Sequence, residues 1–196
     1  MELGQVVRRR KMVRAFQDRP IAPEVVERIL ESGRRAPSAG FSQGFAFLVL
    51  NGPERTGEFW RAVAGDNDWP HEGLRRAPLI VVPLASRQVY LDRYAEPDKG
   101  WTDRDESHWP VPYWIVDTAF AAMLMLLAAV DEGLGALFFG LAPANPSALH
   151  DAFGVPPEYE AIGAIALGHP APDPIVSSAR TRPRKPFDEV VHSGHW

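Results

Sequence analysis

The sequence predicts an α+β or α/β protein in which short apolar strands alternate with helices around one long apolar helix. Residues 114–130 (WIVDTAFAAMLMLLAAV) carry no charge after Asp117 and consist mainly of Leu, Met and Ala, which favour helix. Four further apolar runs have the length and the bounding turn residues of strands. The length of 196 residues suits one domain, residues 1–196, that carries one long insertion.

The apolar helix is the element around which the rest is expected to fold. It is apolar on all sides, which predicts burial on every side. It is too short for a membrane span of roughly 20 apolar residues, and Asp131 and Glu132 close it. Its small residues would let a second helix approach closely: Ala119, Ala121, Ala122, Ala128 and Ala129. That second helix could belong to the same chain, as in an ordinary core, or to a second copy across a two-fold interface.

The first part of the chain predicts two helices and a small-residue loop. The first helix, residues 3–12, carries four consecutive cations at 8–11, which lie either on a solvated face or against an anion. The second begins at Pro23, a good first helical residue, and ends before Pro37. The loop 36–44, APSAGFSQG, would let backbone N–H groups approach a ligand closely.

The middle of the chain predicts two strands and an aromatic segment. Residues 45–50 form a buried strand, residues 54–64 a short helix, and residues 78–84 a second strand in which Pro83 indicates a sheet edge or an early end. Residues 85–112 then carry the aromatic and imidazole side chains of Tyr90, Tyr94, Trp101, His108 and Trp109. This segment is either a lid that gives a pocket its aromatic walls or a surface excursion packed by its own rings.

The last part predicts two more strands and a basic tail. Gly133 and Gly135 turn the chain into a strand at 136–139, a helix begins near Pro146, and a fourth strand covers 159–167. The extension 170–196 is rich in proline and carries a second basic cluster: Arg180, Arg182, Arg184 and Lys185.

Composition excludes several classes of protein. A net charge of −4 argues against a general nucleic-acid binder, and the lack of cysteine excludes disulfides and thiolate chemistry. The sequence has no GxGxxG, P-loop or GxSxG pattern and no histidine spacing typical of a metal site. The N-terminus has no signal-peptide core, so a cytoplasmic protein is expected. Two basic clusters, a Gly/Ser loop and aromatic walls suit a phosphorylated, planar, aromatic ligand.

Four stretches resemble the nitroreductase-like FMN-dependent flavoproteins in order and spacing. They are RRKMVRAF at 9–16, APSAGFSQGF at 36–45, the apolar helix followed by GLGALFFG at 133–140, and RPRKP near the end. The resemblance covers almost the whole chain. It implies an α+β fold with a mixed central β-sheet flanked by helices. It also implies an intertwined homodimer with two FMN molecules in the subunit interface, formed largely by the central helix.

The resemblance also implies which residues bind the cofactor. The matching positions are Arg10, Lys11, Met12 and Arg14 for the phosphate and ring; Arg182 and Arg184 for the rest of the phosphate site; Pro37, Ser38, Ala39 and Phe41 for a loop from the other subunit; and Phe138, Phe139, Gly140 and Leu141 for the backbone beside the reactive edge of the ring. Three positions depart from the family pattern. Met12 stands where a hydroxyl is common, Phe41 replaces an Asn, and Gly44-Phe45 replaces Pro-Trp.

The implied activity is a ping-pong reduction in which NADH or NADPH reduces the flavin and an electron-poor acceptor, such as a nitroaromatic or quinone, is then reduced. The cofactor carries the chemistry, so no catalytic side chain and no metal is expected. The expected partners are a second subunit and a small-molecule acceptor, with no nucleic acid and no membrane. Two alternatives stay open at this point. One is a flavin enzyme of the same fold that destroys flavin or dehalogenates, and the other is a non-catalytic protein that stores FMN.

Overall fold

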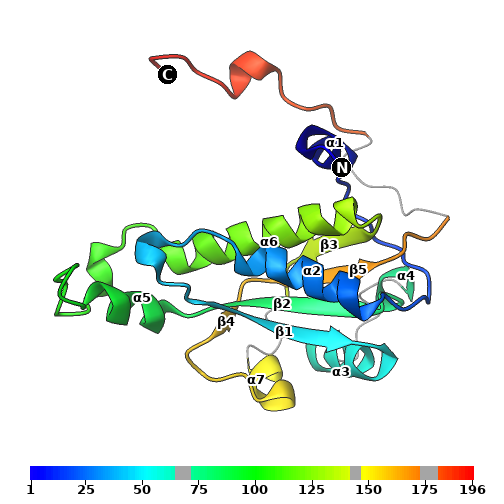
Figure 1. Ribbon diagram of the computed structural model, residues 1–196, viewed down its shortest axis with the longest axis horizontal. Coiled ribbons are helices and arrows are strands. Elements are labelled where there is room, and N and C mark those ends of the chain that lie inside the picture. Colours follow the sequence, from blue (N-terminus) through cyan, green and yellow to red (C-terminus); the bar gives the residue numbers. More distant parts are fainter. Residues whose placement is uncertain (65–71, 142–146, 173–180) are drawn as a thin grey trace.

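A five-stranded antiparallel sheet forms the centre of the protein, shown by a computed structural model that describes residues 1–64, 72–141, 147–172 and 181–196 (Figure 1). Its order is β1 (Phe45–Asn51), β2 (Leu79–Ala85), β5 (Ala164–Gly168) and β3 (Gly135–Phe139), and the short β4 (Glu160–Ala161) also pairs with β2. The pairs between these strands are antiparallel, and a parallel contact comes from the isolated bridge between Met12 and Ala136. The mixed character of the sheet therefore rests on that bridge.

Strand β2 lies at the centre of the sheet and is buried along its whole length. Its side chains alternate between two cores, so that Leu79 and Val81 face one cluster and Ile80 and Val82 face the other. The expectation of a sheet edge or an early end at Pro83 is thus wrong, because the strand is central and continues to Ala85. The edge strands are β1 and β3, and β1, which was expected to be buried, is only half-buried.

Pro83 fits inside a central strand because of where its missing N–H would point. Its carbonyl oxygen accepts a bond from Ile162 N at 3.1 Å, on the side of β4 and β5. The N–H and C=O of one residue point to the same side of an antiparallel strand. The N–H that Pro83 lacks would therefore point to the place where β2 changes partner from β5 to β4. The pairing of β2 with β1 is kept.

The predicted strand 159–167 is divided in two by Gly163. This residue has φ of 148°, and a Cβ there would lie 2.8 Å from the carbonyl oxygen of Phe139. Only glycine can follow that path, so the chain leaves the ladder after β4 and re-enters it as β5.

Helices cover both faces of the sheet (Figure 1). The helices α2 (Pro23–Arg34) and α6 (Tyr113–Asp131) pack together on one face, and α3 (Pro53–Ala64) and α7 (Ala148–Phe153) lie on the other. The start of α2 at Pro23 confirms the prediction, whereas Pro146, near the expected start of α7, lies outside the described residues. The remaining helices are short: α1 (Leu3–Arg9), α4 (Glu72–Arg75), α5 (Arg87–Tyr94), and the 3-10 turns η1 (Ala39–Phe41), η2 (Glu106–His108) and η4 (Phe187–Glu189).

The helix α6 is buried on one side only. Contrary to the expectation that it is too short, its 19 residues would allow it to cross a membrane by length and composition alone, but half of it is buried within the chain, where it contacts α2 and the sheet. Ala122 and Ala129 face the core at 2 % and 0 % exposure, whereas Phe120 and Met123 are 47 % and 45 % exposed. The expected burial on every side is therefore not achieved within one chain, since α1 contacts α6 but the face around Phe120 and Met123 stays exposed in the described structure.

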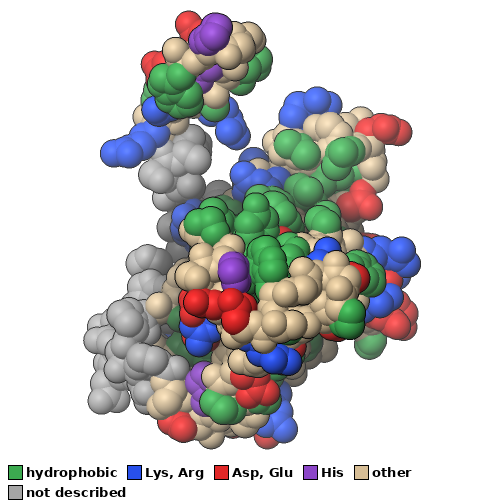
Figure 2. Space-filling model, turned by 90° about the vertical axis from the view of Figure 1, so that its left-hand side faces the viewer, with side chains coloured by type: hydrophobic (Ala, Val, Ile, Leu, Met, Phe, Trp, Pro, Cys, Tyr) green, Lys and Arg blue, Asp and Glu red, His purple; other side chains and the backbone are tan. Residues whose placement is uncertain are grey.

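The two ends of the chain differ. The helix α1 packs against α6, with Val6 buried and the N-terminal amine paired with Asp131, whereas the C-terminal segment 181–196 extends away from the sheet and its helices (Figures 1 and 2). Its large apolar side chains are exposed, with Trp196 at 100 % and Phe187 at 78 %. The helix α1 ends at Arg9 instead of the expected Met12, because Met12 pairs with Ala136 of β3 in extended conformation.

Candidate functional site

The first predicted group of site residues runs beside strand β3. Val13 N donates to Ala136 O at 2.9 Å, and a Cβ on Gly135 would meet the Val13 side chain at 2.8 Å, so the two backbones are in close contact. The bridge between Met12 and Ala136 is parallel, which places Arg14 toward Phe138 and Arg10 toward the start of the strand. The structure therefore brings together the two stretches expected to bind the phosphate and the reactive edge of the ring.

Arg10 is the most informative side chain of this group. It follows the end of α1 and is partly buried, and its Nη1 is buried without a hydrogen-bond partner in the described structure. A guanidinium nitrogen left in this state is costly and is stabilised by an anion, best of all by a carboxylate or phosphate. Arg14 is half-buried and donates to Met12 O at 3.2 Å, and Lys11 is exposed. The three cations have the charge and donors of an anion site.

The far end of β3 supplies an open backbone at Gly140. Phe139 is buried and stacks on Trp60 with ring centroids 5.6 Å apart, which fixes the strand against α3. Gly140 is exposed, and a Cβ added there would meet nothing within 4 Å. A planar ligand can therefore approach the backbone at Gly140 and Leu141 without displacing a side chain. Residues 142–146, which follow, lie outside the described chain.

The loop at 37–41 lies at the other end of α6. Ala39 N donates to Asp117 in the first turns of the helix, whereas Val13 contacts Gly135 just after the helix has ended. Asp117 and Asp131 are fourteen residues apart, so about 21 Å of helix separates the two groups (Figure 1). One chain therefore does not bring Pro37, Ser38, Ala39 and Phe41 to the cations.

The same loop is held in an uncommon conformation. Phe41 and Gln43 have φ of 55° and 54°, and each non-glycine residue in this region costs of order 1–2 kcal/mol. Three kinds of contact fix the loop. Asp117 Oδ2 accepts from Ala39 N at 2.8 Å, Gly40 O accepts from Arg93 Nε at 3.0 Å, and Ser38 Oγ accepts from Gln43 N at 2.9 Å. Phe41 is left 72 % exposed by this arrangement.

Asp117 was expected only to mark the start of the apolar run, and its role in holding the loop was missed. It is 3 % exposed, and its Oδ2 accepts from Tyr90 Oη at 2.7 Å as well as from Ala39 N. Burial raises the pKa of the Tyr90 hydroxyl, and the bond to Asp117 raises it further, so the hydroxyl remains a donor. The signal in the sequence was one acidic residue inside an apolar helix.

The second basic cluster lies apart from the first. Arg182 and Arg184 are exposed on the C-terminal segment that extends from the body (Figure 2). Arg180, also expected in this cluster, lies outside the described residues.

The aromatic segment 85–112 is packed by its own rings. The Trp109 ring lies 4.5 Å from the Tyr94 ring and 5.5 Å from the Trp101 ring, measured between centroids. Ion pairs of Arg87 with Glu106 and of Arg104 with Asp92 join the ends of this excursion at 2.6 and 2.8 Å. The segment also supports the loop, since a Cβ on Gly40 would lie 2.6 Å from the Tyr94 ring.

Replacing Trp109 with Ala should destabilise the protein by roughly 3–5 kcal/mol, because this side chain is 9 % exposed and fills the centre of the ring cluster. Denaturant unfolding followed by circular dichroism would measure the loss. Trp101→Ala is the matched control, since Trp101 is only partly buried and should cost less. Equal losses for the two variants would contradict this packing.

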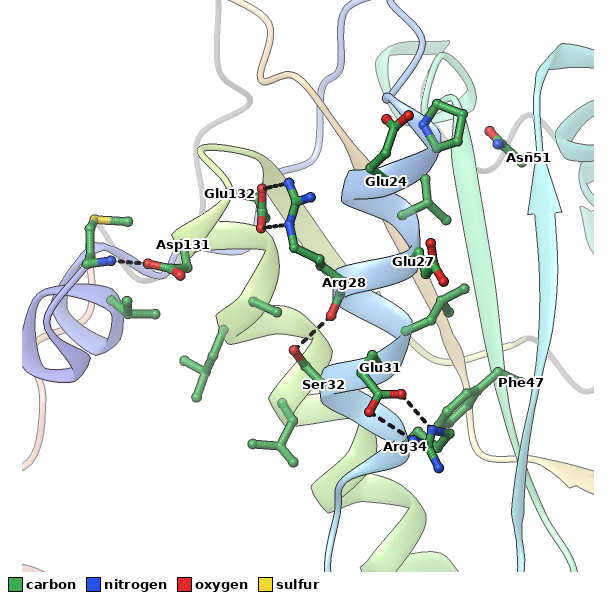
Figure 3. A pocket seen from close by; sticks show the side chains of 18 of the residues that line it. Glu24, Glu27, Arg28, Glu31, Ser32, Arg34, Phe47, Asn51, Asp131 and Glu132 are labelled. Atoms are coloured by element: carbon green, nitrogen blue, oxygen red, sulfur yellow. Dashed lines mark hydrogen bonds and ion pairs between the residues drawn. The ribbon is translucent and has the colours of Figure 1, made fainter.

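A large groove of about 1130 Å³ lies elsewhere, between α1, α2 and α6. Figure 3 shows two ion pairs at this groove: Arg28 of α2 binds Glu132 at the end of α6 at 2.7 Å, and Arg34 binds Glu31 within α2 at 2.6 Å. Its floor is apolar and includes Leu124 and Leu127, on the side of α6 away from the sheet core. The predicted cofactor residues do not line it, so we do not assign the groove to the cofactor.

The α+β fold and the contact between the segment at 9–16 and strand β3 agree with the nitroreductase-like class expected from the sequence. Comparison with known proteins supports the same class. The model of the family described as "Nitroreductase family" matches residues 7–169, so the chain belongs to the nitroreductase family. Membership confirms the expected α+β fold and the expected oxidoreductase class.

The relatives are distant but extend over the whole chain. An NADPH-dependent oxidoreductase of Staphylococcus aureus (strain bovine RF122 / ET3-1) is 26% identical over 194 residues, which cover 97% of this chain and 72% of the relative. The structure of B. megaterium NfrA2 matches with a TM-score of 0.77 and 20% identity, over 100% of this chain and 75% of that one. A nitroreductase family protein from Clostridium difficile 630 matches with a TM-score of 0.74 and 21% identity, over 100% of both chains.

Proposed function

We propose that this oxidoreductase binds FMN, takes electrons from NADPH or NADH, and reduces electron-poor acceptors such as quinones or nitroaromatics. The observation that carries the proposal is the buried Nη1 of Arg10, which has no hydrogen-bond partner in the described structure, on the segment that runs alongside β3. An anionic phosphate next to a planar ring matches these two features. The name of the S. aureus relative supports a nicotinamide donor, and NADPH before NADH.

In this proposal the chain's own residues bind and orient the cofactor, which supplies hydride and electron transfer when bound. Arg10, Lys11 and Arg14 bind the phosphate, and Arg182 and Arg184 complete the cation set. Backbone groups at Phe138, Phe139, Gly140 and Leu141 lie along the ring, and their N–H dipoles favour added negative charge there. Met12 contributes only backbone and apolar contact.

The proposed site needs two copies of the chain. The loop 37–41 is about one helix length from the cations of its own chain, and a two-fold axis across the exposed face of α6 would place it beside the partner's cations. The exposed apolar tail, with Phe187, Val190 and Trp196, would then pack on the partner. We therefore propose an intertwined homodimer, built from one domain per chain and located in the cytoplasm.

Mixing the FMN-loaded protein with NADPH in the absence of oxygen tests the enzyme assignment. The yellow colour should bleach, and adding a quinone should restore it in a second, separate step. Initial rates at several fixed acceptor concentrations should give parallel double-reciprocal lines, as a ping-pong sequence requires. A loaded protein that keeps its colour with both NADPH and NADH would instead indicate the storage alternative.

A further inference from the structure

The loop at 38–43 is fixed by groups that belong to no predicted cofactor contact. Asp117 lies in α6 and Tyr90 and Arg93 lie in α5, and each of the three is joined through hydrogen bonds to the loop or to a partner of the loop. Arg93 is itself held by Asp98, with both of its terminal nitrogens 2.7 Å from the Asp98 oxygens. Two helices far apart in sequence thus converge on six residues of loop.

The conformation that these groups hold is unfavourable by itself. Gly40, Phe41 and Gln43 all have positive φ, between 54° and 60°, and two of them carry a side chain. Strained residues of this kind persist only where the surroundings determine them, and they cluster at functional sites. In this loop the strain has a visible result, because Phe41 projects from the surface with 72 % of its area exposed.

We infer that Asp117, with Tyr90 and Arg93, is a positioning group that holds Phe41 outward, and that Phe41 determines which acceptors the site admits. This inference rests on the proposed function, in which the loop reaches the cofactor of the partner subunit. A phenyl ring placed there offers a flat apolar wall without a hydrogen bond. Flat, weakly polar acceptors such as quinones are therefore favoured over acceptors that need a polar contact at that position.

Asp117 is suited to this task because it is buried and accepts two bonds at one oxygen. The Ala39 amide and the Tyr90 hydroxyl approach Oδ2 at 2.8 and 2.7 Å. Asp117→Ala would leave both donors buried without an acceptor, whereas Asp117→Asn keeps an oxygen in the same place. The two variants separate the effect of losing the hydrogen-bond acceptor from the effect of changing the side-chain volume.

The first measurement is hydrogen–deuterium exchange of the peptide covering residues 37–44, in protein with and without FMN. We expect Asp117→Ala to speed exchange in this peptide by about tenfold or more, Asp117→Asn to stay close to wild type, and Tyr90→Phe to fall between them. Tyr159→Phe is the control, since Tyr159 is a half-buried tyrosine packed on the other core. Unchanged exchange in Asp117→Ala, or in Tyr90→Phe if the alanine variant does not fold, would overturn the positioning role whatever cofactor the protein binds.

The second measurement is the split between KM and kcat for a water-soluble benzoquinone and for nitrobenzoate. Phe41→Ala and Asp117→Ala, each assayed with FMN in excess, should raise the KM for the quinone at least about fivefold relative to nitrobenzoate. The double variant should add little to either single variant, because both act through one ring. Additive effects, or an unchanged ratio between the two acceptors in both single variants, would contradict the role of Phe41. Failure of wild type to bind FMN would contradict the proposed function and this selectivity, while the exchange result would still decide the positioning role.

Discussion

Placing arginine on the exposed face of α6 should abolish the dimer. Ala119 and Met123 lie on this face, Met123 at 45 % exposure, and the two side chains are four residues apart on the helix. An unpaired charge buried in an apolar interface costs about 3–5 kcal/mol. Ala119→Arg or Met123→Arg should therefore weaken the dimer at least about 100-fold.

Light scattering of the purified variants checks this result, and FMN content should fall with the dimer. Ala152→Arg is a matched control, because Ala152 is an exposed alanine on α7, on the opposite face of the sheet. Ala122 and Ala129, two of the small residues expected to let a second helix approach, face the chain's own core, so arginine there would report on folding instead. A monomer mass for FMN-loaded wild type, or dimeric Ala119→Arg and Met123→Arg, would contradict the two-copy site.

Arg10→Ala should weaken FMN binding by roughly 10- to 150-fold. This range corresponds to the 1.5–3 kcal/mol of one charge-assisted hydrogen bond. The substitution also removes the buried, unpartnered nitrogen, so the protein without FMN should be no less stable and the loss should appear only in binding.

Titration of FMN into protein stripped of cofactor, followed by fluorescence quenching, measures the change. Arg8→Ala serves as the control, because Arg8 is a fully exposed arginine of α1 only two positions away. Arg184→Ala should weaken binding by a similar factor if the tail completes the phosphate site. Equal FMN affinity in Arg10→Ala and Arg8→Ala would remove Arg10 from the site.

Local patterns in the sequence were enough to predict most of the fold. The apolar runs became β1, β2, β3 and β5, and the proline at 23 marks the first residue of α2. Errors occurred where a neighbour distant in sequence decides the outcome. Pro83 suggested an edge, but the change of partner between β4 and β5 accommodates it, and no local rule reveals which strands will lie beside it.

The helix α6 is a second case in which the sequence could not show which neighbour covers an element. Its all-round apolar character predicted burial on every side, and the chain covers only one side. Composition alone does not tell whether a helix face is covered by the same chain or by a second copy. The exposed rings and thioether of this helix agree with the second of these possibilities, a two-fold interface.

The sequence named candidate residues for the site, but it did not give their geometry. The segment that carries the cations at 10, 11 and 14 runs beside β3, through the contacts of Met12 and Val13 with Ala136. Asp117 accepts hydrogen bonds from the Ala39 amide and the Tyr90 hydroxyl, which lie up to 78 positions away in sequence, and only the fold brings these groups together. Likewise, the aromatic residues of 85–112 suggested pocket walls, and the structure shows that much of their surface is used to pack against one another.

The visible absorption spectrum of the purified dimer tests the central claim most directly. We predict a yellow protein with about one non-covalent FMN per chain, because each chain contributes one set of cations and one loop. Heat or acid should release the FMN, which can then be identified by chromatography against FAD and riboflavin. A colourless protein that takes up no added FMN would contradict the assignment of Arg10 and β3 to an FMN site.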